Sequence, residues 1–539
     1  MRSRALLIVG LLFTGGSLSG RALAEEKPAA PAPEAANTQT VLLVKGFEFK
    51  GNTVFSNETL AGALAEFVGK PLDPTQLPLL AGRVSALYRD RGFLASAVAS
   101  QPAGGGGVVA VAITESTLGS VTVEGNKRYS GDFLSAHFAR LQRQQVWSVD
   151  SLERSLLLLQ DCPGVERVRS TLRKGSTPGT TDIAVTIEER EKQLHGVSEI
   201  NNSGSTYASR ERLIQRLTYD NATGRGDLTS LQLVTAPNPS DLLMGRLGFQ
   251  MPVNGEGTKL SAYVLNGDFE VGQEFKALQM KGSGFAYGIA VTHPVLKSRR
   301  RTLLGEVGLD VKDEEMKVLG TKATEDKIRV LRIGATYNDL EEQGAVRNLA
   351  SLYIYRGLGD LLGGMPDKSP LASRRGADGR FTKITLEGAR LQKIDDRTLA
   401  VGRVSAQFAD NNLVAGEQMT LGGVDSVRGY PQSESLGDTG YQASVEFRFN
   451  DLLEPSKQPE WLQALQGVAF LDYGRYAVKD AVVGQSGSGD LIGAGLGIRS
   501  QFAQQLGGLS LRLDLGYALK EGPSKASRFQ PYLQLMRSF

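Results

Sequence analysis

The sequence is poor in the residues that most often build metal sites and covalent cross-links. Its 539 residues include one cysteine, Cys162, and three histidines. One cysteine forms no internal disulfide, and His137, His195 and His293 lack the spacing of zinc ligands. Neither a Walker motif nor a G-x-S-x-G elbow with a Ser/His/Asp set is present. We therefore expect no metal, no cofactor, no catalytic residues and no enzymatic activity.

Charge of a single sign and long apolar segments are scarce as well. The formal net charge is +3, and a chain this close to neutrality is not expected to bind nucleic acid or another polyanion. Beyond residue 24, no window approaches the roughly 18–20 consecutive apolar residues of a membrane-spanning helix. We therefore expect no helical membrane anchor in the mature chain.

The first 39 residues predict export followed by a tether. MRSR supplies positive charge, Ala5–Phe13 is a short apolar run, and Ala22-Leu23-Ala24 is a small-x-small cleavage site. Residues 1–24 are therefore interpreted as a signal peptide. Residues 25–39 are rich in proline and alanine, a composition typical of a flexible tether.

Residues 40–116 and 117–190 repeat one order of elements, β-α-α-β-β. In each segment a strand ends in a Gly-Asn turn, two helices follow, and two further strands close the unit. The second helix of the first segment is predicted over about Pro74–Arg91, where apolar residues recur at 3.6-residue spacing. In the second segment we expect the corresponding helix to begin at Asp150, whose carboxylate can cap it together with Glu153. Each segment predicts a small α+β domain.

From residue 191 to 539 the pattern changes to alternation with period two. LSLRLDLGYALK carries leucines and a tyrosine on one face and mostly polar residues on the other, and GYQASVEFRFN alternates in the same way. These segments are longer than the ~5–6 residues of typical soluble strands. About sixteen of them are present, which suits an outer-membrane barrel with a polar lumen. The expected fold class is α+β modules followed by an all-β transmembrane barrel of about 16 antiparallel strands.

Short motifs in both parts of the chain resemble a known family. GFEFKGNTVFSNETL in the first segment and VTVEGNKRYSGDFL in the second resemble POTRA domains. VRGY (Val427 to Tyr430), inside a glycine-rich loop expected at residues 411–439, and FLDYG (Phe470 to Gly474) resemble the two signatures of the outer-membrane polypeptide-transport barrels. Two POTRA domains before sixteen strands is a layout that resembles the two-partner secretion transporters of the haemolysin secretion/activation (TpsB) type.

The resemblance implies a location, a partner and a set of functional residues. It implies a transporter in the outer membrane of a Gram-negative bacterium, surrounded by lipid, with POTRA domain 1 (40–116) and POTRA domain 2 (117–190) in the periplasm. The implied partner is a secreted, TpsA-like exoprotein, a haemolysin or an adhesin, which is captured unfolded and exported through the barrel. The residues implied in transport are Val427, Arg428, Gly429 and Tyr430 in the loop, and Phe470, Asp472 and Gly474 in the barrel.

The parity of GVAFLDYGRY predicts which of these side chains face inward. If Ala469, Leu471 and Tyr473 face lipid, then Phe470, Asp472 and Gly474 face the lumen, and the opposite choice would place a charge in hydrocarbon. A long loop that folds back inside the barrel could bring Arg428 to Asp472 for a two-pronged, charge-assisted bond. Glu446 on the next strand is a competing partner, and the sequence does not separate the two.

Both ends of the chain depart in part from the family pattern. The resemblance implies that the terminal aromatic, Phe539, is read by the barrel-assembly machinery. Leu533 and Leu535 fit the alternation that precedes such an aromatic, but Arg537 does not, unless it snorkels at the interface. Some relatives carry a plug helix before the first POTRA domain. The proline-rich tether disfavours such a helix here.

Two other functions remain open at this point. One is an outer-membrane protein insertion or assembly factor of the same superfamily, whose members usually carry more POTRA domains. The other is a passive solute channel with periplasmic adaptor domains. Two modules favour secretion over assembly. The channel alternative predicts that a change at Arg428 alters conductance but leaves protein export intact.

Overall fold

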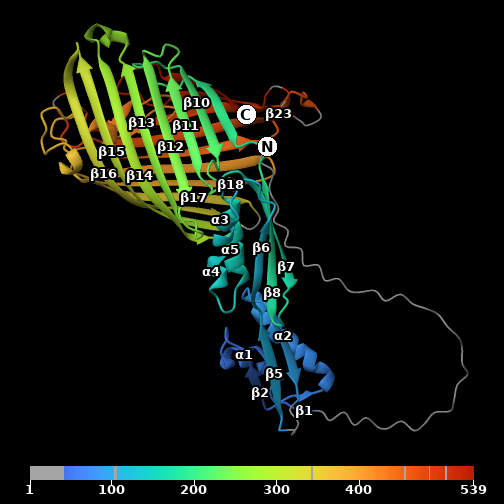
Figure 1. Cartoon of the computed structure of the whole chain (residues 1–539). Coiled ribbons are helices and arrows are strands. Elements are labelled where there is room, and N and C mark those ends of the chain that lie inside the picture. Colours follow the sequence, from blue (N-terminus) through green and yellow to red (C-terminus); the bar gives the residue numbers. More distant parts are fainter. Residues whose placement is uncertain are drawn as a thin grey trace, which may run out of the picture. The chain divides into compact units, whose positions relative to one another are not determined.

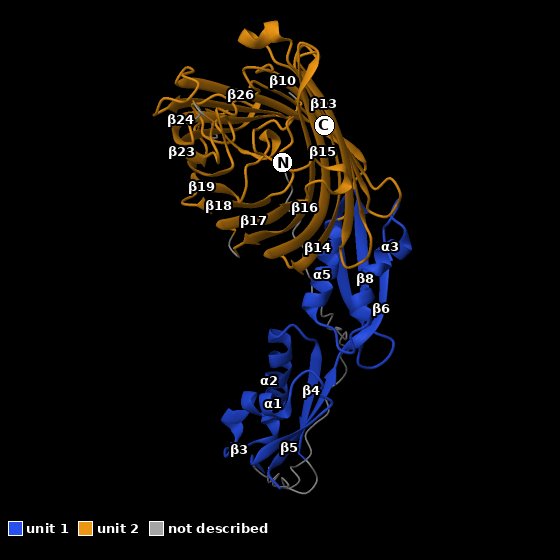
Figure 2. Cartoon of the chain, turned by 90° about the vertical axis from the view of Figure 1, so that its left-hand side faces the viewer, with its two compact units in different colours: residues 1–161, 165–189 blue, residues 162–164, 190–539 orange. Residues whose placement is uncertain are grey.

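The computed structural model describes residues 42–539 apart from 102–105, 342–343, 454–456, 483, 485, 504 and 506. The predicted signal peptide and tether lie outside the described residues. The chain divides into two compact units, residues 1–161 with 165–189 and residues 162–164 with 190–539 (Figure 2). Within the described ranges, no helix has both the length and the apolar character needed to cross a membrane.

The first module packs its helices on one three-stranded sheet. The strand order is β2-β5-β4, with β2 parallel and β4 antiparallel to β5. Leu60 of the first helix, Val84 of the second and Val111 of β5 are almost completely buried and belong to its core. The elements are β1 (Leu42–Leu43), β2 (Gly46–Lys50), α1 (Asn57–Ala63), β3 (Pro71–Leu72), α2 (Leu77–Asp90), β4 (Ala95–Ser100) and β5 (Val108–Glu115).

The second module repeats this arrangement with the strand order β6-β8-β7. The elements are β6 (Thr117–Glu124), α3 (Gly131–Ala136), α4 (Ala139–Gln142), α5 (Val149–Gln160), β7 (Val165–Lys174) and β8 (Thr180–Glu189). The cap predicted at Asp150 is wrong. Ser148 is the N-cap of α5, and its hydroxyl accepts a hydrogen bond from the Ser151 N–H (3.2 Å). Asp150 lies in the first turn of the helix, two positions after the N-cap, which is too late to cap it.

A buried glutamate closes the Gly-Asn turn of the first module. Glu115 accepts hydrogen bonds from the N–H groups of Thr53 (2.8 Å) and Val54 (2.9 Å), and from the Tyr88 hydroxyl (2.6 Å). Burial by itself raises the pKa of Glu115, but the hydrogen bonds to its charged form outweigh burial and lower the pKa below the ordinary glutamate value. The carboxylate therefore stabilises the folded module in its ionised form.

The second module uses the same device at the same place. Glu189 accepts from the N–H groups of Lys127 (2.8 Å), Arg128 (3.1 Å) and Tyr129 (3.2 Å), which follow the second Gly-Asn turn. Burial raises the pKa of Glu189, and these backbone hydrogen bonds reverse the shift and lower it. The two modules therefore close their Gly-Asn turns in the same way, each with one buried carboxylate.

Replacing Glu115 by glutamine is expected to lower the free energy of unfolding of the first module by about 2 kcal/mol at pH 7, because a charged acceptor of several hydrogen bonds is lost. Since the folded pKa is depressed, the contribution is present above the ordinary pKa of about 4.3 and disappears as the pH falls through the lower folded value. Urea unfolding of a fragment spanning residues 42–190 measures the loss of unfolding free energy at pH 7, and the same experiment at pH 3 measures how much of that loss has disappeared. The exposed Glu124→Gln is the control, and an equal loss in both variants would contradict the assignment.

The two modules touch at a second point besides the peptide that links them. The Val149 N–H donates to the Gly92 carbonyl (2.7 Å), and Phe93 forms an antiparallel β-bridge with Ser148. Gly92 has a φ of +76°, a conformation that favours glycine. The end of α2 therefore lies against the start of α5.

The remaining described chain closes a ring of 16 antiparallel strands (Figure 1). Strand β26 pairs with β9 to complete the ring, from Gln534 opposite Asn201 to Ser538 opposite Val197. The fold class predicted from the sequence is confirmed. The strands are β9 (Leu194–Asn201), β10 (Arg212–Asp220), β11 (Leu228–Thr235), β12 (Leu242–Pro252), β13 (Lys259–Glu270), β14 (Lys281–Lys297), β15 (Arg301–Val318), β16 (Thr321–Leu340), β17 (Val346–Gly357), β18 (Thr382–Lys393), β19 (Thr398–Ala409), β22 (Thr439–Phe449), β23 (Leu462–Ala477), β24 (Ser488–Phe502), β25 (Leu509–Ala518) and β26 (Phe529–Ser538).

Alternate side chains of the barrel strands point outward, and they are apolar. On β22, Val445 is 48% exposed while its neighbour Glu446 is 1% exposed, and on β25 Leu515 is exposed while Asp514 is fully buried. Soluble monomers rarely expose apolar patches beyond a few hundred Å². Here the apolar surface continues from strand to strand, as the lipid-facing band of a membrane barrel does.

Candidate functional site

The loop between β19 and β22, residues 410–438, returns into the ring of strands. It contains a short hairpin of β20 (Met419–Leu421) and β21 (Ser435–Gly437). Gly422 and Gly423 follow β20 with φ values of +97° and +108°, which glycine adopts without steric cost. Figure 2 looks into the barrel, and loop segments lie inside it.

Arg428 anchors the tip of this loop to the barrel wall. Its guanidinium donates to Asp472 on β23 through Nε to Oδ2 (2.7 Å) and Nη2 to Oδ1 (2.9 Å), and its backbone N–H adds a bond to Oδ2 (3.1 Å). Arg428 is 2% exposed and Asp472 is fully buried. Two parallel charge-assisted bonds constrain orientation as well as distance. Asp472 therefore sets the direction in which the loop tip points.

Arg428 has further neighbours, among them Ser444, to whose hydroxyl its Nη2 donates (3.3 Å). Its Nη1 donates to Glu446 Oε2 (2.9 Å) and lies 3.7 Å from Asp514 Oδ2. Its guanidinium carbon lies 3.4 Å from the centre of the Phe470 ring, a cation–π contact. The sequence left the choice between Asp472 and Glu446 open, and in the structure one arginine binds both. The contact between Asp514 and Arg428 was not predicted from the sequence, because β25 meets the loop only once the barrel is closed.

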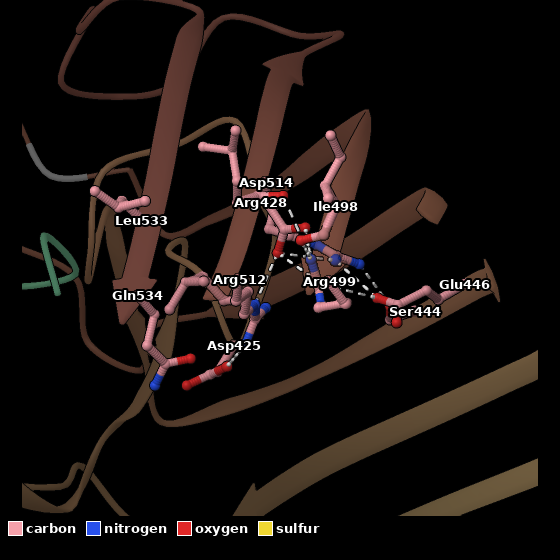
Figure 3. Close-up of polar contacts among 12 residues, drawn as sticks. Asp425, Arg428, Ser444, Glu446, Ile498, Arg499, Arg512, Asp514, Leu533 and Gln534 are labelled. Carbon is pink, nitrogen blue, oxygen red and sulfur yellow. Dashed lines mark hydrogen bonds and ion pairs between the residues drawn. The ribbon is translucent and has the colours of Figure 1, made fainter. Parts of the chain in front are cut away.

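These carboxylates also bind Arg448, Arg499 and Arg512, of which Figure 3 labels the last two. Glu446 accepts from Arg448 (2.6 Å). Asp514 accepts from Arg499 (2.6 Å) and from Arg512 (2.9 Å). Asp425 pairs with Arg512 at 3.1 Å, and Arg403 lies 4.0 Å from Glu446, so the luminal ion cluster holds five arginines and four carboxylates. Its members are Arg403, Arg428, Arg448, Arg499, Arg512, Asp425, Glu446, Asp472 and Asp514.

Strand β23 has the facing that its sequence predicts. Phe470 and Asp472 are buried on the inside, and Leu471 between them is 53% exposed on the outside. A Cβ added at Gly474 would lie 2.9 Å from Cγ2 of Val427, the first residue of the loop motif. Val427 is fully buried, so the glycine of FLDYG leaves the space that the loop side chain fills.

The last two motif residues bind the adjoining part of the wall, beyond β23. The Tyr430 hydroxyl donates to the Lys520 carbonyl (2.7 Å) and accepts from the Ile492 N–H (3.1 Å). Tyr532 on β26 accepts from the Gly429 N–H (3.1 Å) and donates to the Tyr430 carbonyl (2.6 Å). Tyr532 was missed from the sequence, although the alternation of β26 places it on the inner face.

Glycines in β24 and β25 let the loop backbone touch the wall. A Cβ at Gly493 would lie 1.7 Å from the Arg428 carbonyl oxygen, and one at Gly516 would lie 2.5 Å from the Gly429 nitrogen. Side chains at these positions would displace the tip. All residues of the two sequence motifs are thus gathered at one place in the barrel, together with these two glycines.

A cavity of about 600 Å³ lies beside the tip. Its polar lining includes Ser351, Glu387, Arg403, Ser405 and Gln442, from strands β17 to β22. In the part of the chain that the structure describes, no group of three or more side chains is arranged to hold a metal ion. The loop tip therefore borders a cavity into which several charged and polar side chains of the barrel wall point.

Phe539 lies away from this site, at the end of β26. Its N–H and C=O both pair with Gly196 of β9 (3.0 Å each), and its ring is 54% exposed. Arg537, which breaks the apolar alternation, is also exposed. The terminal residues therefore take part in closing the barrel.

Two family models match the chain. The model described as haemolysin secretion/activation protein ShlB/FhaC/HecB matches residues 179–500, and the ShlB-type POTRA domain matches residues 42–116. The heme/hemopexin transporter protein HuxB of Haemophilus influenzae strain 86-028NP is 24% identical over 504 residues, 91% of this chain and 86% of its own length. The outer membrane transporter CdiB of Dickeya dadantii is 22% identical, over 74% of this chain and 70% of its own length.

Solved structures agree on the fold. CdiB from Escherichia coli aligns over 95% of this chain and 93% of its own, with a TM-score of 0.77 and 18% identity. CdiB from Acinetobacter baumannii aligns over 93% of this chain and 90% of its own, with a TM-score of 0.68 and 15% identity. Both alignments extend over the modules and the barrel.

Proposed function

Because this chain belongs to the family of haemolysin secretion/activation proteins, the ShlB/FhaC/HecB family, we propose that it exports one unfolded exoprotein, haemolysin-like or adhesin-like, from the periplasm to the cell surface. It is an outer-membrane transporter of the two-partner secretion class, whose POTRA domains lie in the periplasm, and the class is not enzymatic. The proposal adds the kind of cargo, its unfolded state and the roles of individual residues.

The observation that carries the proposal is the anchored loop inside a polar barrel. A passage blocked by a permanent plug would need no charges, whereas this loop is held by a buried ion cluster whose internal bonds can be exchanged for water or for a passing chain. Buried ion pairs are weak stabilisers overall. The roles proposed are loop anchor for Arg428, wall partners for Asp472 and Phe470, and close-packing positions for Val427, Gly429, Tyr430 and Gly474.

Capture of the cargo is proposed to occur on the edges of the module sheets. Strands β2 and β4 border the first sheet, and β6 and β7 border the second. An edge strand offers unpaired N–H and C=O groups, and an extended segment can add to it with little demand on sequence. Folding of the exported protein outside the cell would then give transport its direction.

The ends and boundaries of the chain complete the proposal. We propose residues 1–24 as signal peptide, 25–39 as tether, 40–116 and 117–190 as the POTRA domains and 191–539 as the barrel. Phe539 is proposed as the residue that the barrel-assembly machinery reads during insertion, and lipid of the outer membrane surrounds the finished barrel.

Deleting the gene tests the function. The expected result is the loss of a single large protein from the cell surface or the culture medium, with other outer-membrane barrels at normal levels. Quantitative mass spectrometry of the culture medium and of the outer-membrane fraction measures both. Loss of many barrels would instead support an assembly factor. An unchanged set of secreted proteins, with altered uptake of small solutes, would support a passive channel.

A further inference from the structure

A second loop reaches the transport loop from the neighbouring strands. Residues 358–381 join β17 to β18, and their Met365, Ala377 and Phe381 are almost completely buried. They pack against Leu413 and Val414, at the start of the transport loop 410–438, and against two residues of β16. The stem of the transport loop therefore rests on another loop as well as on the barrel wall.

One ion pair joins these two loops. Arg374 of the second loop donates through Nη1 to Asp438 Oδ1 (2.5 Å) at the last residue of the transport loop. Asp438 is fully buried, and only a small part of the Arg374 side chain is exposed. Neither residue belongs to a motif, and neither takes part in the luminal ion cluster.

The pair also supplies hydrogen-bond partners for both the N–H and the C=O group of two residues in neighbouring loops. Asp438 accepts from the N–H groups of Leu413 (2.9 Å) and Lys479 (2.7 Å), and Arg374 donates to the carbonyl groups of the same two residues (2.7 and 3.1 Å). Leu413 lies in the transport loop, and Lys479 lies in the loop after β23. Three loops are thus joined through one cation and one anion.

A second carboxylate ties the same stem to the wall. Glu417, in the 3-10 turn Ala415–Glu417, is 3% exposed. It accepts from Lys312 of β15 (2.6 Å) and from Lys383 of β18 (2.5 Å), one lysine on each oxygen. The stem is therefore anchored to the barrel as well as to its neighbouring loops, and the tip at Arg428 is held from both ends.

We infer that Arg374 is a positioning residue for the transport loop: acting from residues 358–381, it holds the stem at Asp438 and thereby keeps the VRGY tip against Asp472. Without the guanidinium, Asp438 loses its cation and two carbonyl groups lose their donor, while the bonds from the Leu413 and Lys479 N–H groups remain. The stem is then held less tightly and opens more often. The inference rests on the proposed role of the loop in export. Its test measures where the loop lies and not what is exported, so either proposal can fail alone.

The test is the rate at which trypsin cleaves after Arg428 in intact cells, followed by mass spectrometry of the released peptides. In the parent protein Arg428 is 2% exposed and protected. Arg374→Gln is expected to raise this rate about tenfold, because local opening of the stem frees the tip. Arg375→Gln, at the adjacent exposed arginine, is the matched control and should leave the rate unchanged. Equal protection of Arg428 in both variants overturns the inference.

If the Arg374→Gln variant does not accumulate as a folded barrel, Arg374→Lys replaces it as the test variant. It keeps the charge but lacks the fork that reaches both carbonyl groups, and about threefold faster cleavage is expected. Ser373 Oγ accepts from the Ala415 N–H (3.0 Å), so we would place a pair of cysteines at positions 373 and 415 to cross-link the two loops at this contact. The two cysteines are combined with Arg374→Lys and with Cys162→Ser in one variant. Oxidation of the cysteine pair should restore the protection of Arg428 from trypsin, and reduction should remove it. Unchanged cleavage in the reduced form overturns the inference.

Discussion

Replacing Arg428 by alanine is expected to reduce export of the partner protein at least about tenfold, while folded barrel accumulates at the normal level. The change leaves Asp472 and Glu446 buried beside each other without their shared cation, and removing one member of a buried pair costs roughly 3–5 kcal/mol. Once the loop tip leaves its position, water can reach these carboxylates of β22 and β23, so the loop moves while the strand ladder of the barrel remains closed. Secreted partner, normalised to heat-modifiable barrel, is the measurement.

The companion change Asp472→Ala is expected to have a smaller effect. Arg428 then keeps its bond to Glu446 (2.9 Å) and its approach to Asp514 (3.7 Å), so the tip is loosened but still attracted to the wall. Arg375→Ala, at an exposed position, is the control for loss of an arginine. Export at the normal level by both Arg428→Ala and Asp472→Ala, with normal amounts of barrel, would remove the proposed anchor.

Gly493→Ala is expected to impair export about as strongly as Arg428→Ala without altering any charge. The added Cβ would lie 1.7 Å from the Arg428 carbonyl oxygen, and a backbone atom of the loop cannot rotate away as the end of a side chain can. The loop tip must therefore move, and its side-chain bonds to Asp472 are lost by geometry alone. Export and tryptic cleavage after Arg428 should change together.

Gly402→Ala is the matched control for this steric prediction. Gly402 also lies within a barrel strand, β19, but a Cβ there has no atom within 4 Å. Its substitution is expected to leave export and protection of Arg428 unchanged. If the Gly493→Ala variant exported as much protein as the Gly402→Ala variant, the close approach of the loop to β24 would not matter for transport.

The fold and part of the site follow from local patterns in the sequence. Alternation along β22, β23 and β25 depends only on neighbouring residues, so it predicts the barrel and the inward facing of Asp472. The α5 cap was mispredicted by two residues, because Ser148 and Asp150 are both suitable capping residues and only backbone geometry separates them.

The partners that the sequence did not reveal are those that come together through closure of the ring. Tyr532 meets Gly429 across 103 positions of sequence, and Arg374 meets Asp438 across 64. No periodicity links residues so far apart, and each pair joins a loop to an element that reaches it only in the finished barrel. The VRGY and FLDYG residues were found because a resemblance supplied what periodicity could not.

The contact between Gly92 and Val149 has a mechanical consequence for the two periplasmic modules. A pair of bodies joined by one peptide can swivel freely, whereas a pair joined at two separated places turns only about the line through both. Here the line runs through the Ser116–Thr117 linkage and the Gly92–Val149 bond. Rotation of the first module about this line keeps both attachments, whereas rotation about any other line breaks the Gly92–Val149 hydrogen bond.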